Sequence, residues 1–182
     1  MKNIFLIVII LSISIIAFTQ ENSLDKLLYK KGVYQKQETY DLLGINGKYN
    51  AMDMDIVKVS QSGVSIYFLR LSYDYPSKGT FVNVIEYTEL LDILRSAKQL
   101  KVDSEKEIHV SKPDDTQSSY KTLDGLELGY FIDYKQVDKS PIWFIKISYS
   151  IRDALFIVKD FATVESSLNR AKQKIEEVKV LK

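Results

Sequence analysis

The clearest pattern in the chain is a strand in which apolar and polar side chains alternate. In residues 142–149 every second side chain, starting at Trp143, is apolar, whereas the opposite face carries Lys146 and Ser148. Because successive side chains of a strand point to opposite faces, one face is predicted to lie on a core and the other to be partly solvated. Residues 64–73 show the same division of faces.

Two helices are predicted, one in each half of the chain. Thr88 and Thr163 are expected to be their N-caps, because a threonine hydroxyl can accept a hydrogen bond from a free N–H of the first turn. Each helix has apolar residues at spacings of three and four, which is typical of a helix that lies on a core. The stripes comprise Leu90, Leu91, Leu94, Ala97 and Leu100 in the first helix and Val164, Leu168, Ala171, Ile175 and Val178 in the second.

Four strands are predicted before each helix. They cover residues 38–43, 52–59, 64–73, 80–87, 120–123, 126–134, 142–149 and 154–160. Residues 44–47, 61–63 and 124–125 are rich in glycine, asparagine and aspartate, which favour tight turns. Residues 74–79 and 135–141 are expected to be loops.

The two halves of this plan match residue by residue. A shift of 76 positions superposes Ile66, Phe68, Ser72 and Tyr73 on Ile142, Phe144, Ser148 and Tyr149. Past the following loop, a shift of 74 superposes Val84, Tyr87, Leu94, Ala97, Lys98 and Gln99 on Val158, Phe161, Leu168, Ala171, Lys172 and Gln173. Shared alternation explains some matches, but the recurring Ser-Tyr and Ala-Lys-Gln groups favour a true duplication. A unit of about 70 residues is longer than a solenoid module of roughly 20 to 45, so a pseudo-twofold domain is predicted.

The predicted fold class is α+β, with a mostly antiparallel sheet from two ββββα-like repeats in a pseudo-twofold relation and helices packed on one side. A single domain is expected over residues 38–182. It comprises a first repeat at 38–101, a polar connector at 102–119 and a second repeat at 120–182. The connector is predicted to hold a short edge strand at 107–110.

This order of elements is similar to that of the single-stranded-DNA-binding PC4 and Whirly proteins, which also use four strands and a helix. The resemblance lies in element order and not in motif residues. It implies single-stranded nucleic-acid binding as one alternative function, which would need a basic groove with stacking aromatic side chains.

Residues 1–19 have the features of a secretory signal peptide. A short basic start precedes an apolar run from Ile4 to Phe18, and cleavage is expected near Thr19. The run is about 15 residues, shorter than the roughly 20 that cross a bilayer as a helix, which favours cleavage over a retained membrane anchor. We therefore expect a secreted or periplasmic bacterial protein in which residues 20–37 form a tether or a short helix.

The composition excludes several kinds of chemistry and of binding partner. Removing residues 1–19 takes away Lys2 and lowers the formal net charge from +1 to 0, so no long-range field would draw the domain to nucleic acid or anionic lipid. The chain has no cysteine, which excludes disulfides, thiolate catalysis and cysteine-ligated zinc. Its one histidine, His109, lies in the polar connector and is expected to be solvated. Neither a metal centre nor a cofactor is predicted.

Catalytic groupings are missing from the sequence. Two acidic pairs, Asp53 with Asp55 and Asp114 with Asp115, lack the further ligands and the glycine of a calcium loop. The first pair is interpreted as the solvated face of a strand and the second as part of a loop. Serine-nucleophile motifs and glycine-rich phosphate loops do not occur. The chain is therefore not expected to be an enzyme. Its 24 acidic residues leave a small carboxylate-dependent hydrolase, acting on glycan or peptide, as an alternative.

Aromatic side chains remain as a resource for binding, with 12 tyrosines, 8 phenylalanines and 1 tryptophan. Most fall at core-facing strand positions. Tyr75 in a loop, and Tyr130 and Tyr134 on the strand 126–134, are the candidates for exposed binding residues, because a contiguous aromatic patch would indicate a protein or glycan surface. The leading hypothesis is a non-enzymatic exported module that binds a partner protein or an envelope component through its sheet face or loops.

Overall fold

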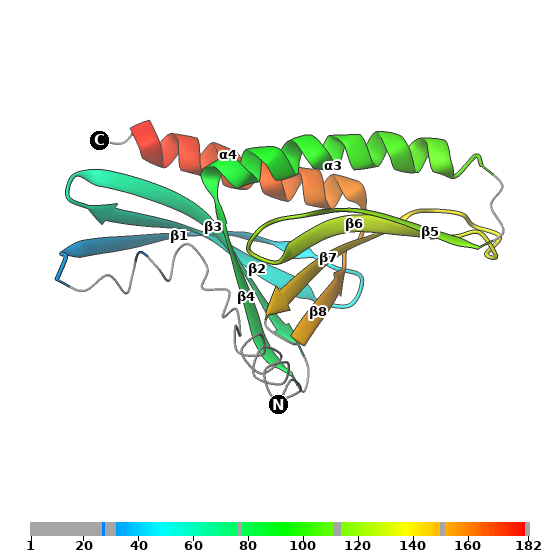
Figure 1. Cartoon of the computed structure of the whole chain (residues 1–182), viewed down its shortest axis with the longest axis horizontal. Helices are drawn as coiled ribbons and strands as arrows, with labels where there is room; N and C mark the ends of the chain where they lie inside the picture. The colour runs from blue at the N-terminus through cyan, green and yellow to red at the C-terminus, as the bar shows by residue number, and fades with distance from the viewer. Residues whose placement is uncertain (1–26, 28–31, 76–77, 111–113, 150–151, 181–182) are drawn as a thin grey trace, which may run out of the picture.

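Two four-stranded antiparallel sheets and two long helices make up the fold, as a computed structural model shows. It describes residues 27, 32–75, 78–110, 114–149 and 152–180. The predicted signal peptide at 1–19 therefore lies outside the described residues. Figure 1 shows both helices along one side of the molecule, with the sheets on the other. The predicted α+β class, with two ββββα units and helices on one side, is confirmed.

Both sheets are meanders in which strands adjacent in sequence are hydrogen-bonded neighbours. The first repeat contains β1 (Gln35–Asn46), β2 (Ala51–Gln61), β3 (Val64–Tyr75), β4 (Gly79–Glu86) and α3 (Tyr87–Glu107). The second contains β5 (Asp115–Lys121), β6 (Leu126–Asp133), β7 (Ile142–Tyr149), β8 (Arg152–Ile157) and α4 (Phe161–Val180). Tyr87 and Phe161, which the shift of 74 superposes, are the first residues of the two helices.

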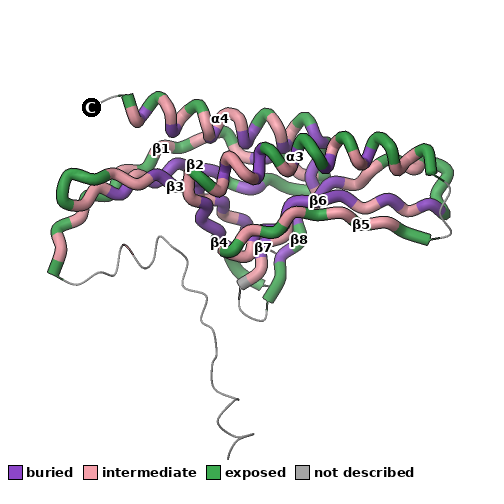
Figure 2. The backbone as a smooth tube through the Cα atoms, turned by 45° about the horizontal axis from the view of Figure 1, so that its top comes forward, coloured by how far each residue is buried: buried purple, intermediate pink, exposed green. Residues whose placement is uncertain are grey.

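Burial along the strands follows the predicted alternation. On β3, Tyr67 is 6% exposed and Leu69 and Leu71 are 0% exposed, and the equivalent side chains on β7 are buried as well. Figure 2 shows the resulting alternation of buried and exposed positions along the strands and helices. These residues belong to one hydrophobic core that takes side chains from both sheets and both helices. No helix within the described residues is long and apolar enough to cross a membrane.

Each helix packs on the sheet of the other repeat. Helix α4 contacts β1 and β2, and α3 contacts β5 and β6 as well as β3 and β4. Between the helices, Tyr87 Oη donates a hydrogen bond to Glu176 Oε1 (2.9 Å), and Lys179 Nζ lies 3.3 Å from the centre of the Tyr87 ring. Lys101 Nζ lies 5.7 Å from the centre of the Phe161 ring. The first residue of each helix thus packs beside a lysine of the other, a reciprocal arrangement that fits the pseudo-twofold relation.

The connector between the repeats is shorter than predicted, because α3 continues through residues 102–107 and β5 already begins at Asp115. Ser104 is buried on this last part of the helix, and its hydroxyl donates a hydrogen bond to the carbonyl oxygen of Lys101 (2.8 Å). The predicted edge strand at 107–110 is wrong, since Glu107 ends the helix. The polar composition of this stretch concealed a helix that is held by tertiary contacts.

The predicted turn at 44–47 begins too early. β1 runs through most of this stretch, and its register with β2 shifts between Leu42 and Ile45. A Cβ atom at Gly44 would lie 2.6 Å from the carbonyl oxygen of Met52, so a side chain there would force the strands apart. The glycine therefore serves a close approach between strands, while the chain reverses farther along.

Both helices begin earlier than predicted, so the two threonines lie inside the first turn. At α4 the cap is Asp160, whose Oδ1 accepts hydrogen bonds from the hydroxyl and the N–H of Thr163, each 2.7 Å long. These two bonds lower the pKa of Asp160. At α3 the preceding residue is Glu86, which makes no side-chain capping bond, and Thr88 is exposed.

The two helix starts give a matched pair of variants. Asp160→Ala removes the capping oxygen and is expected to lower the free energy of unfolding by about 1 kcal/mol. Thr88→Ala is expected to change it by less than about 0.5 kcal/mol. Because the pKa of Asp160 is lowered on folding, its contribution is present above the ordinary carboxyl pKa and is lost as the pH falls through the lowered value. Urea unfolding of both variants measures this, and equal losses would contradict the assignment.

Candidate functional site

Two of the three tyrosines predicted as surface residues are buried. Tyr130 is 0% exposed and Tyr134 is 9% exposed. The Tyr130 hydroxyl donates a hydrogen bond to Oε2 of Glu107 (3.0 Å), and the Tyr134 hydroxyl donates one to the backbone carbonyl of Glu107 (3.2 Å). Burial, together with the Glu107 carboxylate, raises the pKa of Tyr130. Their expected exposure is therefore wrong, because both side chains hold the end of α3 on the second sheet.

Tyr75 belongs to the other sheet, as the last residue of β3, and is half-buried. Its ring packs edge-on against the rings of Tyr73 and Phe81, with centroids 5.9 and 6.3 Å away. Lys78 Nζ lies 4.7 Å from the centre of the Tyr75 ring. The structure thus does not bring the three tyrosines together, and a binding role for Tyr75 stays a prediction.

The anchoring role of Tyr130 can be tested by removing one oxygen atom. Tyr130→Phe leaves the ring in the core but deletes the hydrogen bond to Glu107, and we expect the free energy of unfolding to fall by about 1 to 2 kcal/mol. Tyr49→Phe is the matched control, because Tyr49 is 79% exposed. Thermal and urea unfolding provide the comparison. Equal stability of the two variants would remove this role from Tyr130.

The acidic candidates and the histidine lie apart. Oδ2 of Asp55 accepts hydrogen bonds from Nε (3.1 Å) and Nη2 (2.7 Å) of Arg70. The Asp55 carboxylate is therefore already paired with a cation of the same chain. Asp114 is exposed, 3.4 Å from Lys135 Nζ, and His109 is exposed just after α3. Among the described residues, no three histidine, aspartate or glutamate side chains are placed to hold a metal ion.

A pocket of about 480 Å³ opens between the start of α3 and the turn that joins β5 to β6. We call it the acidic pocket; it is lined by Glu86, Thr88, Glu89, Asp92, Tyr120, Lys121, Thr122, Leu123 and Asp124. Its size lies within the range of roughly 300 to 1,000 Å³ that is usual for sites that enclose a small ligand or a side chain. Four of its residues are carboxylates and one is a lysine.

The β5–β6 turn is a rigid wall of this pocket. The side-chain amide of Asn83 on β4 donates a hydrogen bond to the carbonyl oxygen of Asp124 (2.6 Å), and the N–H of Ser148 on β7 donates one to the carbonyl of Gly125 (2.9 Å). Gly125 has a φ of 82°, a conformation that side chains rarely adopt. The turn is thus fixed by both sheets, and a ligand would meet it already formed.

Glu89 lies at the centre of the electrostatics of the pocket. Its Oε1 accepts a hydrogen bond from the N–H of Leu123 (3.1 Å), which ties α3 to the turn. Burial raises the pKa of Glu89, the hydrogen bond from Leu123 lowers it, and the charges of Asp124, Glu86 and Asp92 raise it further, for a net upward shift. Ionisation of this carboxylate therefore destabilises the folded chain. A cation brought into the pocket would offset that destabilisation.

The cations nearest the pocket already have partners. Asp92 pairs with Arg95 one turn along the exposed face of α3. Lys121 Nζ lies 3.5 Å from Oε2 of Glu127, which is itself 4% exposed on the second sheet. Burial, followed by the charges of Asp92 and Glu89, raises the pKa of Tyr120. Among the described residues that line the pocket, four are carboxylates and Lys121 is the one cation.

Comparisons of the chain with protein-family models, with curated proteins and with solved structures find no match.

The acidic pocket was not predicted from the sequence. One signal was available, since Glu86, Glu89 and Asp92 recur every three residues and share one side of the helix start. The position of Asp124 near this helix could not be predicted, because it depends on the β5–β6 turn of one repeat reaching the helix of the other.

Glu89→Gln tests the electrostatic description. The amide oxygen can still accept the Leu123 hydrogen bond, while the repelled charge is removed, so we expect the variant to be more stable than the parent at neutral pH. Because the folded pKa of Glu89 is raised, the deficit of the parent is present above that pKa and disappears as the pH falls below the ordinary carboxyl range. Unfolding curves measured across pH, with Glu165→Gln on α4 as control, decide this. Destabilisation by Glu89→Gln at every pH would contradict it.

Proposed function

We propose that the chain is an exported, non-enzymatic binding module that receives a basic side chain of a partner protein in the acidic pocket. The observation that carries the proposal is the half-buried Glu89 carboxylate, whose pKa is raised by burial and by three neighbouring carboxylates. Export is the part of the proposal that rests on residues 1–19 alone.

The arrangement of charge favours an organic cation. The carboxylates of the acidic pocket do not converge as a metal-binding group, so a ligand has to reach them separately across the opening. An arginine guanidinium has five donors in a planar fork and meets carboxylates in pairs, and a lysine ammonium supplies three donors. Either would offset the repulsion around Glu89 at the moment of binding.

The rim of the acidic pocket adds an apolar contact. Leu123 is 89% exposed at the tip of the β5–β6 turn, although its backbone is held by Glu89. Tyr120 is half-buried beside it. The methylene stem of a bound arginine or lysine, or an apolar neighbour in the same peptide, could cover these side chains while the charged head enters the pocket. This supports an extended segment that joins a basic residue to an apolar one.

A pair of peptides tests the proposal. The full chain is titrated with acetylated, amidated Leu-Arg-Leu and with Leu-Gln-Leu, and binding is followed by calorimetry and by NMR shifts of the Leu123 amide. We expect the arginine peptide to bind at least about tenfold more tightly, in proportion to about 1.4 kcal/mol of charge interaction, and its affinity to fall with added salt. Its affinity should also fall as the pH drops through the raised pKa of Glu89, since protonation removes the charge.

Two variants provide the control. Glu89→Gln is expected to abolish the preference for arginine, whereas Glu105→Gln, at an exposed position near the other end of α3, is expected to preserve it. Equal binding of the two peptides by the parent chain, or equal loss in the two variants, would refute the proposal.

A carboxylate-dependent hydrolase is the second candidate, favoured by the same residue. General acid catalysis uses a carboxyl group whose pKa is raised, with further carboxylates nearby, and the pKa of Glu89 is raised by burial and by the charges of Asp124, Glu86 and Asp92. In that case Glu89→Gln would abolish hydrolysis of a chromogenic glycoside or a fluorogenic peptide while substrate binding survived. Single-stranded nucleic-acid binding, implied by element order, stays a prediction.

A further inference from the structure

The first sheet is apolar on both faces over part of its area. Val57 and Phe68 are 0% exposed, and Val59 and Val84 are 2% exposed. These four side chains form a cluster separate from the main core, because they alternate along their strands with the residues that face the helices. A sheet face open to water carries polar residues at such positions. The cluster therefore requires a covering layer on the side of the sheet away from the helices.

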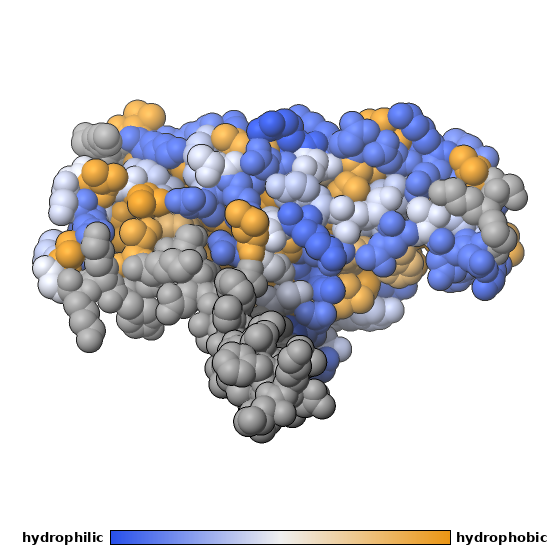
Figure 3. Space-filling view, viewed as in Figure 1, coloured by the Kyte–Doolittle hydropathy of each residue, from blue (hydrophilic) through white to orange (hydrophobic). Residues whose placement is uncertain are grey.

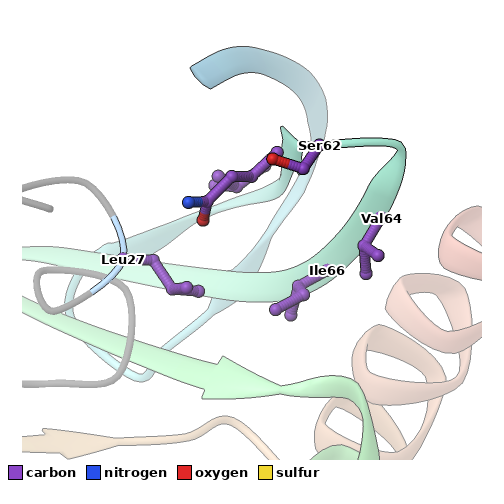
Figure 4. Close-up of a pocket in the computed structure, with 6 residues that line it drawn as sticks. Leu27, Ser62, Val64 and Ile66 are labelled. Atoms are coloured by element: carbon purple, nitrogen blue, oxygen red, sulfur yellow. The ribbon is translucent and has the colours of Figure 1, made fainter. Parts of the chain in front are cut away.

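Leu27 supplies part of that layer. Within the described residues, Leu27 and Ile66 are the partly buried apolar side chains that pack against the cluster. The side-chain amide of Gln35, the first residue of β1, also donates a hydrogen bond to the carbonyl oxygen of Leu27. Figure 4 shows Leu27 directed along β3 toward Ile66. Leu27 is thus held to the sheet through both its backbone and its side chain.

The groove that holds Leu27 is larger than one leucine. A cavity of about 280 Å³ lies between Leu27 and the β2–β3 hairpin, and it is lined mostly by apolar residues, among them Val59, Val64 and Ile66. Val64, at its rim, is 63% exposed. Figure 3 shows apolar side chains gathered at this end of the molecule. The apolar surface of the groove therefore extends beyond the contact that Leu27 makes.

Charged side chains border the groove on its other side. Past Phe68, the same face of β3 carries Arg70, which pairs with Asp55 on β2 (2.7 Å). Because an ion pair is poorly covered by an apolar partner, the groove suits a short amphipathic segment better than a broad apolar surface.

We propose that this face of the first sheet is a docking groove for the chain's own segment around Leu27, which is thereby part of the folded domain and not a free tether. In the sequence, Leu24 and Leu28 stand three residues before and one after Leu27, a spacing typical of an amphipathic segment. The short connection from Leu27 to β1 keeps this occupant at high local concentration, ahead of a second copy or an external partner. The groove shares no lining residue with the acidic pocket, so the two proposals stand or fall separately.

Because the chain has no cysteine, cross-linking tests the proposal cleanly. In the full chain, Leu27→Cys is combined with Ile66→Cys in the groove, and in a control with Leu155→Cys, which is exposed on the second sheet. A short bis-maleimide is added and the cross-linked monomer is quantified over time. The groove pair is expected to link within one chain at least about tenfold faster than the control pair, at a rate independent of protein concentration.

Three outcomes would overturn the proposal. They are equal rates for the two pairs, a groove pair that links between chains and so assigns the groove to a second copy, and no linkage at all. A second measurement does not depend on cysteine. Leu27→Asp in the full chain is expected to increase binding of an apolar fluorescent dye, whereas Leu43→Asp, at a 69% exposed position on β1, is expected to leave it unchanged. Equal dye binding by the two variants would also refute the proposal.

Discussion

The reciprocal packing of the helices is the constraint on which the rest of the structure depends. Helix α4 ends the second repeat but lies on β1 and β2, while α3 ends the first repeat and extends over β5 and β6. Neither sheet could bury its apolar face, which includes Leu69 on β3 and Ile145 on β7, with the helix of its own repeat alone. The two repeats therefore share one hydrophobic core.

The acidic pocket is a product of the same arrangement. Because α3 crosses onto the second sheet, its first turn meets the β5–β6 turn, and Glu89 accepts the N–H of Leu123 there. At the related place in the other half, the β1–β2 turn meets the end of β8, and backbone hydrogen bonds join Lys48 to Ile157 (2.9 Å) and Lys159 to Asn46 (3.3 Å). One junction is thus closed by backbone pairing and the other is lined with carboxylates, so the candidate site lies where the repeats differ.

Sequence patterns predicted the parts of the fold that depend on local alternation, and missed those that depend on contacts between repeats. The buried faces of β3 and β7 could be predicted because the apolar or polar character of each side chain indicates whether it faces the core. The last turn of α3 could not be predicted, because Glu107 at its end is held by Tyr130 on β6 and by Tyr134 just after that strand. The same reason explains why those tyrosines were mistaken for surface residues. Of the candidate site, the acidic spacing before and within α3 could be seen in the sequence, and so could the turn at 124–125, whereas the approach of that turn to the start of α3 could not.

A shared core predicts that the two repeats unfold together, and the single tryptophan makes this measurable. Trp143 reports on the second repeat, and the repeat relation places Tyr67 at the equivalent position of the first. The double variant Tyr67→Trp, Trp143→Tyr therefore moves the fluorescent probe to the other sheet. In both proteins, urea unfolding followed by fluorescence is predicted to coincide with unfolding followed by helix circular dichroism, with the same midpoint and slope. Fluorescence and circular dichroism transitions that separate in either protein would show that the repeats fold independently, and would contradict the account.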